Sequence, residues 1–168
     1  MAGICEKQGL VVDNFSSLFK AVSNGDLKNL DTILLNEFSV QAFKNLSPTL
    51  LHQAANNRRS KVLQYLIQHG SFVDGKNAQS MTALHVVARL GDVDSLRVLL
   101  ENEANINEVD YDNRTPLYFA SYDGHFECVK ELLQNENINI HIHRKGGWTH
   151  LHEVARFGHF KCMGILLR

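Results

Sequence analysis

The sequence predicts an all-α solenoid of stacked helix–turn–helix units with projecting β-hairpin loops. The first observation behind this prediction is a short motif that recurs at a near-constant interval, and the second is a leucine-rich stretch that follows each copy in the same register. The copies are TLLHQAA from Thr49, TALHVVA from Thr82, TPLYFAS from Thr115 and THLHEVA from Thr149, at intervals of 33, 33 and 34 residues. A fainter copy, SSLFKAV, begins at Ser16.

The first helix of a unit can be followed in the copy at residues 115–124. Thr115 is a good N-cap, and Pro116 suits the first helical position because its missing N–H would have no partner there. Leu117 and Ala120 lie three residues apart and therefore share one face. Gly124 ends this helix because glycine adopts a left-handed conformation at low cost.

The second helix of each unit carries an apolar face and leads into an Asn-rich stretch that predicts a finger-like hairpin. No single unit can bury its apolar faces alone, so the units must stack into an elongated solenoid. The inner-face residues are Leu63, Leu66 and Ile67, then Leu96, Leu99 and Leu100, then Val129, Leu132 and Leu133.

The pattern resembles the ankyrin repeat in its period, its T-P-L-H-x-A motif and its helix–turn–helix with hairpin. The resemblance covers residues 14–168 and leaves 1–13 as an N-terminal extension. The expected units are a capping repeat at 14–43, a second at 44–76, a third at 77–109, a fourth at 110–143 and an incomplete fifth at 144–168.

Several residues depart from the family pattern. Arg58 replaces the glycine that ends the first helix of the second repeat, so the junction NNRRS is expected to be irregular or mobile. In the family, the motif histidine ties its loop by hydrogen bonds. The fourth repeat has Tyr118 at this position and is expected to tie its loop differently or less well. The other repeats keep the histidine, as His52, His85 and His152.

Composition excludes some functional classes. The chain has 168 residues, of which 44% are hydrophobic and 21% charged, with a formal net charge of −1. That balance argues against nucleic-acid binding, and no apolar run is long enough to span a membrane. Three widely spaced cysteines, Cys5, Cys128 and Cys162, indicate a reducing, cytoplasmic location rather than a disulfide framework.

No catalytic or metal site is predicted. His141, His143, His150 and His152 lie near one another in sequence, but a zinc site needs three or four converging ligands, and His152 already belongs to the repeat motif. Cys128 and Cys162 occupy equivalent helix positions and are interpreted as small packing residues. The sequence contains no phosphate-binding glycine motif. We therefore expect a non-enzymatic chain without a cofactor or a metal.

A protein partner is expected on the concave surface that the resemblance implies, formed by the hairpin tips and the ends of the first helices. Aromatic rings there alternate with arginines, which are typical of interface hot spots; the alternative is that the rings pack within the protein. The candidate residues are Met81, Arg89, Leu90, Tyr111, Asp112, Arg114, Tyr122, Asp123, Lys145, Trp148, Arg156 and Phe157.

The stretch RTPLYFASYDGH, residues 114–125, carries three rings that are expected to point to at least two places. Phe119 is expected to fill a gap between stacked helices, and Tyr118 is interpreted as a structural departure first and a binding candidate second. Only Tyr122 is expected to face the partner.

Two functions remain open. The leading hypothesis is a protein–protein interaction module. The alternative is an N-terminal substrate-recruiting or autoinhibitory segment of a larger enzyme, or of a bacterial effector acting in the host cytosol. The end at GILLR, without a polar cap, motivates the expectation that the chain is part of a longer protein. A monomer is expected, and end-to-end packing of two C-termini is the less favoured explanation of that end.

Overall fold

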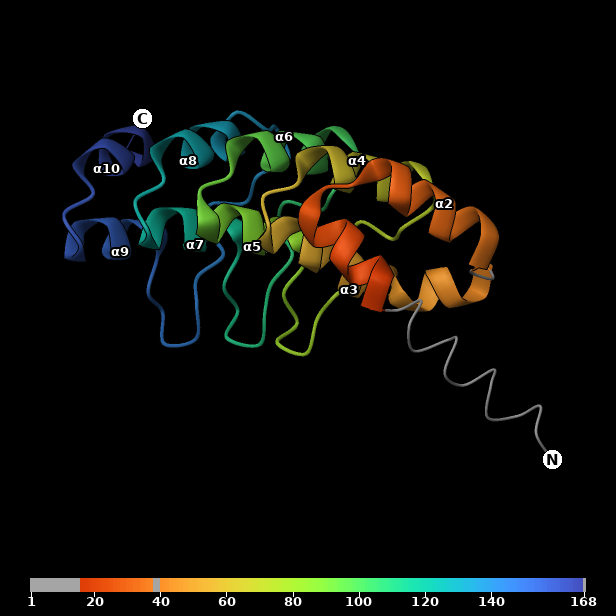
Figure 1. Ribbon diagram of the computed structural model, residues 1–168. Helices are drawn as coiled ribbons and strands as arrows, with labels where there is room; N and C mark the ends of the chain where they lie inside the picture. Colours follow the sequence, from red (N-terminus) through yellow and green to blue (C-terminus); the bar gives the residue numbers. More distant parts are fainter. Residues whose placement is uncertain (1–15, 38–39, 168) are drawn as a thin grey trace.

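The computed structural model describes residues 16–37 and 40–167, so the expected extension at 1–13 lies outside the described residues. The helices form two stacked rows, and loops project from one row to the same side (Figure 1). The inner row, next to these loops, contains α3 (Val40–Asn56), α5 (Ala83–Leu90), α7 (Pro116–Tyr122) and α9 (His150–Arg156). The outer row contains α4 (Ser60–Gln68), α6 (Val93–Glu101), α8 (Phe126–Leu133) and α10 (Phe160–Leu166).

The N-terminal unit consists of a helical stretch over residues 16–24 and α2 (Leu27–Glu37). From α3 onward, each inner helix packs on the next inner helix and on the outer helix of its own repeat, and each outer helix packs on the next outer helix. These contacts confirm the predicted solenoid.

The core runs between the two rows of helices. Leu63, Leu96 and Leu132 from successive outer helices are fully buried, as are Leu117 and Ala120 on α7. The last member of each predicted apolar triplet is only partly buried and lies at the edge of the core; these residues are Ile67, Leu100 and Leu133.

Threonines begin α5, α7 and α9 as the motif predicts, whereas Thr49 lies inside α3. Thr82 and Thr149 form capping boxes, in which the ring of the histidine three residues later bonds back to the threonine. At α7, the Thr115 hydroxyl oxygen accepts a hydrogen bond from the backbone N–H of Tyr118, at 3.2 Å. The cap is therefore kept in the fourth repeat, although the histidine is not.

A left-handed residue follows each of these inner helices. Gly91 and Gly124 have φ of +69° and +73°, and a β-carbon at either glycine would lie 2.5 Å from a ring nitrogen of the histidine one repeat later. Those histidines, His125 and His159, approach so closely because each Nε2 bonds to a backbone carbonyl of the preceding repeat, at 2.9 Å. Glycine is required here by both the backbone angle and the close approach.

The junction NNRRS has the same turn as the others. Arg58 adopts φ of +55°, near the glycine value, and its Nη2 donates to the Leu90 carbonyl at 2.6 Å. The expected irregularity is therefore not present, because Arg58 accepts the left-handed conformation that glycine adopts elsewhere.

The projecting loops, here called fingers, connect outer helices to the next inner helices. Each finger is closed by a backbone hydrogen bond, such as Asp110 N–H to the Arg114 carbonyl at 3.1 Å, but no strand is assigned among the described residues. Adjacent fingers are joined by the bond from Lys145 N–H to the Asp112 carbonyl, at 2.9 Å. Between the first two repeats, α3 extends through the region where a finger would otherwise start, with Pro48 inside the helix.

Candidate functional site

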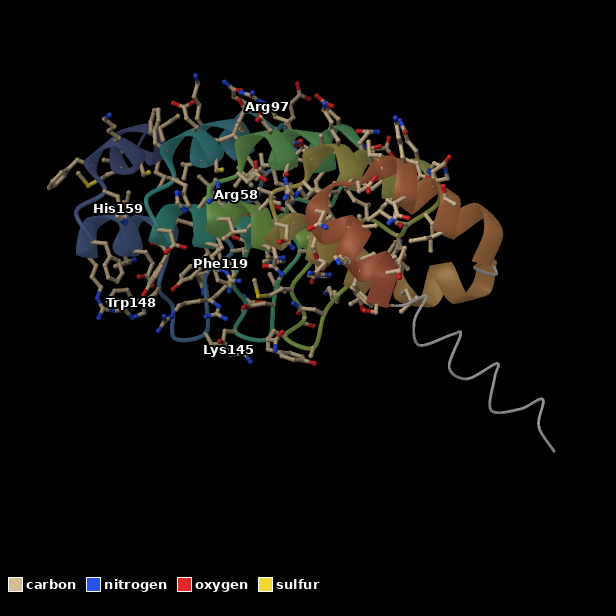
Figure 2. All side chains as sticks on the ribbon, in the orientation of Figure 1. Arg58, Arg97, Phe119, Lys145, Trp148 and His159 are labelled. Atoms are coloured by element: carbon tan, nitrogen blue, oxygen red, sulfur yellow. The ribbon has the colours of Figure 1, made fainter. Side chains whose placement is uncertain are left out.

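The candidate site is the surface between the fingers and the inner helices. Figure 2 places Phe119 and Trp148 on the finger side of the inner row and Lys145 at a finger tip, whereas Arg97 lies on the outer row. Most of the predicted partner-binding residues are at least partly exposed. The exposed ones are Arg89, Tyr111, Asp112, Tyr122, Asp123, Lys145, Trp148, Arg156 and Phe157, and the partly exposed ones are Leu90 and Arg114.

Met81 differs from this group. Its side chain is 5% exposed and belongs to the hydrophobic core, and its backbone carbonyl accepts a hydrogen bond from His52 Nε2 at 2.7 Å. An unbranched apolar side chain turns into the core, whereas the arginine at the equivalent position, Arg114, keeps its charged end near water. Met81 offers a partner little surface.

A cavity of about 250 Å³ opens on this surface across three successive repeats. Arg89 comes from the third repeat, Arg114 and Tyr122 from the fourth and Arg144 from the fifth. The complete lining is Arg89, Arg114, Tyr118, Phe119, Tyr122, Asp123 and Arg144. Arg89, Arg114, Tyr122 and Asp123 were expected from the sequence at this surface. Tyr118 was expected there only as a second possibility, and Phe119 and Arg144 were not expected there.

The three rings of the fourth repeat meet at this cavity. Tyr118 stacks on Tyr122 with ring centroids 5.9 Å apart, and it contacts Phe119 edge to face at 5.6 Å. Tyr118 and Tyr122 share one face of α7 because they are four residues apart. Phe119 instead packs edge to face against His85 of the third repeat, at 6.0 Å, so the three rings do point to two sides. Phe119 is buried, but the Arg114 guanidinium covers its ring at 5.0 Å from the centroid.

Arg114 is held in place by carboxylates of its own finger. Its Nε and Nη2 donate to Asp110 Oδ2 at 2.8 and 2.6 Å, and Nη2 also lies 3.2 Å from Asp112 Oδ2. Asp110 is buried, which by itself raises the pKa of its carboxyl. The hydrogen bonds and charge of Arg114 outweigh this burial and hold the pKa of Asp110 below its usual value. The guanidinium is therefore held in position by the protein itself.

Arg144 is held by a network of polar contacts between the fourth and fifth repeats. Tyr118 donates its hydroxyl to Glu153 Oε1 at 3.0 Å and accepts from Arg144 Nη1 at 3.3 Å. Arg144 Nη1 also lies 3.7 Å from Glu153 Oε1. Glu153 is 1% exposed, and within the described residues its Oε2 has no hydrogen-bond partner. Burial is the largest cause that raises the pKa of Tyr118, so its hydroxyl remains a donor at neutral pH.

This network joins three departures from the repeat pattern. Tyr118 occupies the motif-histidine position, and Arg144 occupies the turn position of Asp110. Glu153 occupies the position of Val86 in the third repeat. Because the three departures meet in space, they replace the histidine tie by a different polar contact, as the sequence led us to expect for the fourth repeat.

The same junction also holds a buried histidine. His150 is 3% exposed and bonds through Nε2 to the Thr115 hydroxyl at 3.1 Å. Desolvation is the largest influence on its ring and lowers its pKa to about 4. His150 is therefore neutral at pH 7 and packs as a structural residue.

A second group, the rings of Trp148 and Phe157 with Arg156 between them, lies at the two ends of α9. The Arg156 guanidinium sits over both rings, at 5.5 Å from the Trp148 centroid and 5.4 Å from the Phe157 centroid. Phe157 also contacts Tyr122 at 4.7 Å, which connects this group to the cavity. The expected alternative of packing within the protein is thus partly realised, but Trp148 and Phe157 remain 37% and 42% exposed.

The other chemical candidates lie away from this surface. Cys128 and Cys162 are buried free thiols, and burial is the main cause that raises the pKa of Cys128 to about 12. A thiol of this kind is a poor nucleophile at neutral pH. Among the described residues, no group of three or more His, Cys, Asp or Glu side chains could hold a metal ion. In that part of the chain, no helix has the length and apolar character needed to cross a membrane.

Comparison with known proteins agrees with this architecture. The family model described as ankyrin repeats (3 copies) matches residues 18–110 and 104–168. Tyrosine-protein kinase HTK16 of Hydra vulgaris is 28% identical over 165 residues, covering 95% of this chain and 22% of the relative. Putative E3 ubiquitin-protein ligase XBAT31 of Arabidopsis thaliana is 30% identical over 164 residues, covering 89% and 36%. Alpha-latrotoxin-Lg1a of Latrodectus geometricus is 26% identical over 158 residues, covering 90% and 12%. The chain thus spans little more than a third, at most, of the length of each of these three relatives.

Proposed function

We propose that this chain, which belongs to the ankyrin repeat family, is a non-catalytic module. In this proposal it binds a protein partner through its concave face. Ankyrin repeats generally mediate protein–protein interaction, and this chain adds a distinctive surface to that general role. The fold alone does not choose a partner, so the proposal depends on the residues of the site.

The observation that supports the proposal is a set of exposed aromatic rings between the fingers and the inner helices. Tyr111 is 65% exposed, and Tyr122, Trp148 and Phe157 are between 37% and 42% exposed. A partner that covers these rings would remove their apolar surface from water, which favours binding. Tyr, Trp and Arg also dominate interface hot spots. The proposed contact residues are Arg89, Leu90, Tyr111, Asp112, Arg114, Tyr122, Asp123, Lys145, Trp148, Arg156 and Phe157.

Packing within the protein prepares these rings for binding. Arg156 covers one face of the Trp148 ring, and Phe157 supports Tyr122 edge to face. Restricted side chains lose less conformational entropy on association than mobile ones, so the same contacts that hold the rings favour their use as anchors.

The test combines affinity capture with a paired variant. Tyr122→Ala with Trp148→Ala removes two exposed rings and is expected to weaken binding of the identified partner by at least about tenfold, with little change in stability. The matched control is Phe160→Ala, which removes a 74% exposed ring from the outer helix α10. Equal affinity of the double variant and the parent in a titration would overturn the proposed surface.

A second candidate is a substrate-recruiting or autoinhibitory segment of a larger enzyme or of a bacterial effector. It is favoured by relatives named as a tyrosine-protein kinase and an E3 ubiquitin-protein ligase, of which the matching part is a minor fraction. Reading the gene beyond Arg168 tests this candidate directly. A catalytic domain in the same frame supports it, and an immediate stop codon excludes a following domain.

A cytoplasmic location accompanies the leading proposal. Cys128 and Cys162 are free and buried on successive outer helices. This arrangement suits a reducing compartment, in which a fold does not depend on disulfides. Fractionation of cells expressing a tagged chain tests the location, and recovery of the chain in a secreted fraction would contradict it.

A further inference from the structure

The cavity between the third and fifth repeats presents many more hydrogen-bond donors than acceptors. Three guanidinium groups line it, from Arg89, Arg114 and Arg144. The acceptors in its lining are the exposed carboxylate of Asp123 and the hydroxyls of Tyr118 and Tyr122. A guanidinium carries five N–H donors and accepts nothing. The chemistry of the lining therefore favours a group that only accepts.

Many of these donors are unused within the described residues. Arg114 engages carboxylates through Nε and Nη2, which leaves Nη1 without a partner there. Arg144 engages Tyr118 through Nη1, which leaves Nε and Nη2. Arg89 makes no side-chain hydrogen bond or salt bridge to any described residue. A bound acceptor could therefore use these donors without breaking existing bonds.

Two of the carboxylates that pair with these arginines, Asp110 and Glu153, stand behind them, whereas Asp112 is exposed beside Arg114. The side chains of Asp110 and Glu153 are each 1% exposed, whereas those of Arg114 and Arg144 are 30% and 39% exposed. The buried carboxylates thus aim the guanidiniums outward rather than compete for the open side of the cavity. Guanidiniums that are held from behind and keep donors free toward the opening are suited to bind an anion.

The backbone around the cavity is also fixed from the next repeat. His125 bonds to the Arg89 carbonyl and His159 to the Tyr122 carbonyl, both at 2.9 Å. The stacked rings of Tyr118 and Tyr122 form an apolar wall. An anion beside such a wall interacts more strongly with the guanidiniums than it would in open water. If the anion belongs to a side chain, the methylene groups of that side chain can pack on the rings.

We infer that this cavity binds the carboxylate of a Glu or Asp side chain in an extended segment of the protein partner. The inference rests on the proposed function and specifies the chemistry of its partner. A volume of about 250 Å³ suits one side chain rather than a folded domain. The neighbouring rings Trp148 and Phe157 would then contact apolar residues of the same segment.

The experiment uses short random peptides displayed on phage and selected against the whole chain. The selected peptides are expected to share an acidic residue, and its replacement by the matching amide is expected to weaken binding by about tenfold or more. Arg89→Gln is expected to weaken binding similarly. Asp123→Asn removes the negative charge of the lining and is expected to strengthen it. The control Arg97→Gln, on the outer helix α6, is expected to leave it unchanged.

The outcomes separate this inference from the proposed function. Peptides that require Tyr122 but bind equally well as acid and amide versions overturn the inference and leave the function standing. A selected peptide whose phosphoserine version binds far more tightly than its Glu version overturns the assignment to a carboxylate. If no selected peptide depends on Tyr122 or Trp148, the proposed function fails as well.

Discussion

At the junction between the third and fourth repeats, His85 donates from Nε2 to the Arg114 carbonyl at 3.1 Å and accepts the Thr82 N–H on Nδ1 at 3.0 Å. At the next junction, Tyr118 takes the place of this histidine and donates to the side chain of Glu153, at 3.0 Å. The first junction uses one neutral ring to satisfy two backbone groups. The second uses a phenol, a carboxylate and a guanidinium.

The difference shows that a departure from the repeat pattern is tolerated when its neighbours change with it. A buried carboxylate alone would be costly, and Glu153 is acceptable because Tyr118 and Arg144 lie against it. The three residues should therefore behave as one unit in mutational experiments. The changed junction also places Arg144 in the wall of the proposed binding cavity.

Acid should weaken both junctions, because each contains a buried neutral histidine. Burial lowers the pKa of His85 and of His150 to about 4, from an ordinary value of 6.5. Between pH 4 and 6.5 the unfolded chain therefore binds more protons than the folded chain. Stability falls as the pH falls from 6.5 to 4, and these groups leave it unchanged above 6.5. Each histidine is expected to cost up to about 3 kcal/mol at pH 4, measured by urea unfolding.

The variant His150→Pro separates the two contributions. It restores the motif proline at the first position of α9 and removes one titrating ring from the fourth–fifth junction. Its stability is expected to depend less steeply on pH than that of the parent, while His85 keeps its own contribution. An unchanged pH dependence would contradict the assignment to His150.

Tyr118→His is expected to have the next largest effect. It restores the family residue but leaves the buried Glu153 carboxylate without its phenol donor, at a cost of about 3 kcal/mol in the free energy of unfolding. The triple variant Tyr118→His, Arg144→Asp and Glu153→Val introduces residues that earlier repeats carry at these positions, namely His85 and Val86 of the third and Asp110 of the fourth. It is expected to recover most of that loss, and additive losses across the three changes would show that they are not one unit.

Gly91→Ala and Gly124→Ala test a contact that both junctions share, in which a left-handed glycine lies against a histidine ring of the next repeat. Both glycines have positive φ, and each would place a β-carbon 2.5 Å from the ring of His125 or His159. The strained backbone and the displaced histidine together are expected to cost about 2 kcal/mol at either position. Thermal unfolding should give similar values for the two variants, and a large inequality would show that the junctions differ in more than the tyrosine network.

The fold could be predicted closely from the sequence because the repeat is a local pattern copied several times. Threonine caps, glycine ends and apolar triplets each depend on neighbours within one unit. The helix that extends through Pro48 was not predicted, since proline normally marks the start of a helix rather than its interior.

The candidate site was predictable only where its residues follow the register of the repeat. Arg89, Arg114 and Tyr122 occupy positions that the family exposes. Tyr118 and Arg144 occupy positions that are normally structural, and only their three-dimensional proximity shows that they join the cavity wall. Their shared departure from the pattern was a signal in the sequence, but the pairing with Glu153 depends on how successive repeats stack.

The three guanidiniums of the cavity come from three successive repeats, so a group bound there would link these repeats to one another. In a linear array, each unit is supported by its neighbours alone, so the units can unfold partly independently. A group that engages Arg89, Arg114 and Arg144 together acts as a clamp across the third, fourth and fifth units. Occupancy would therefore raise the midpoint of unfolding and make the transition of these units more cooperative.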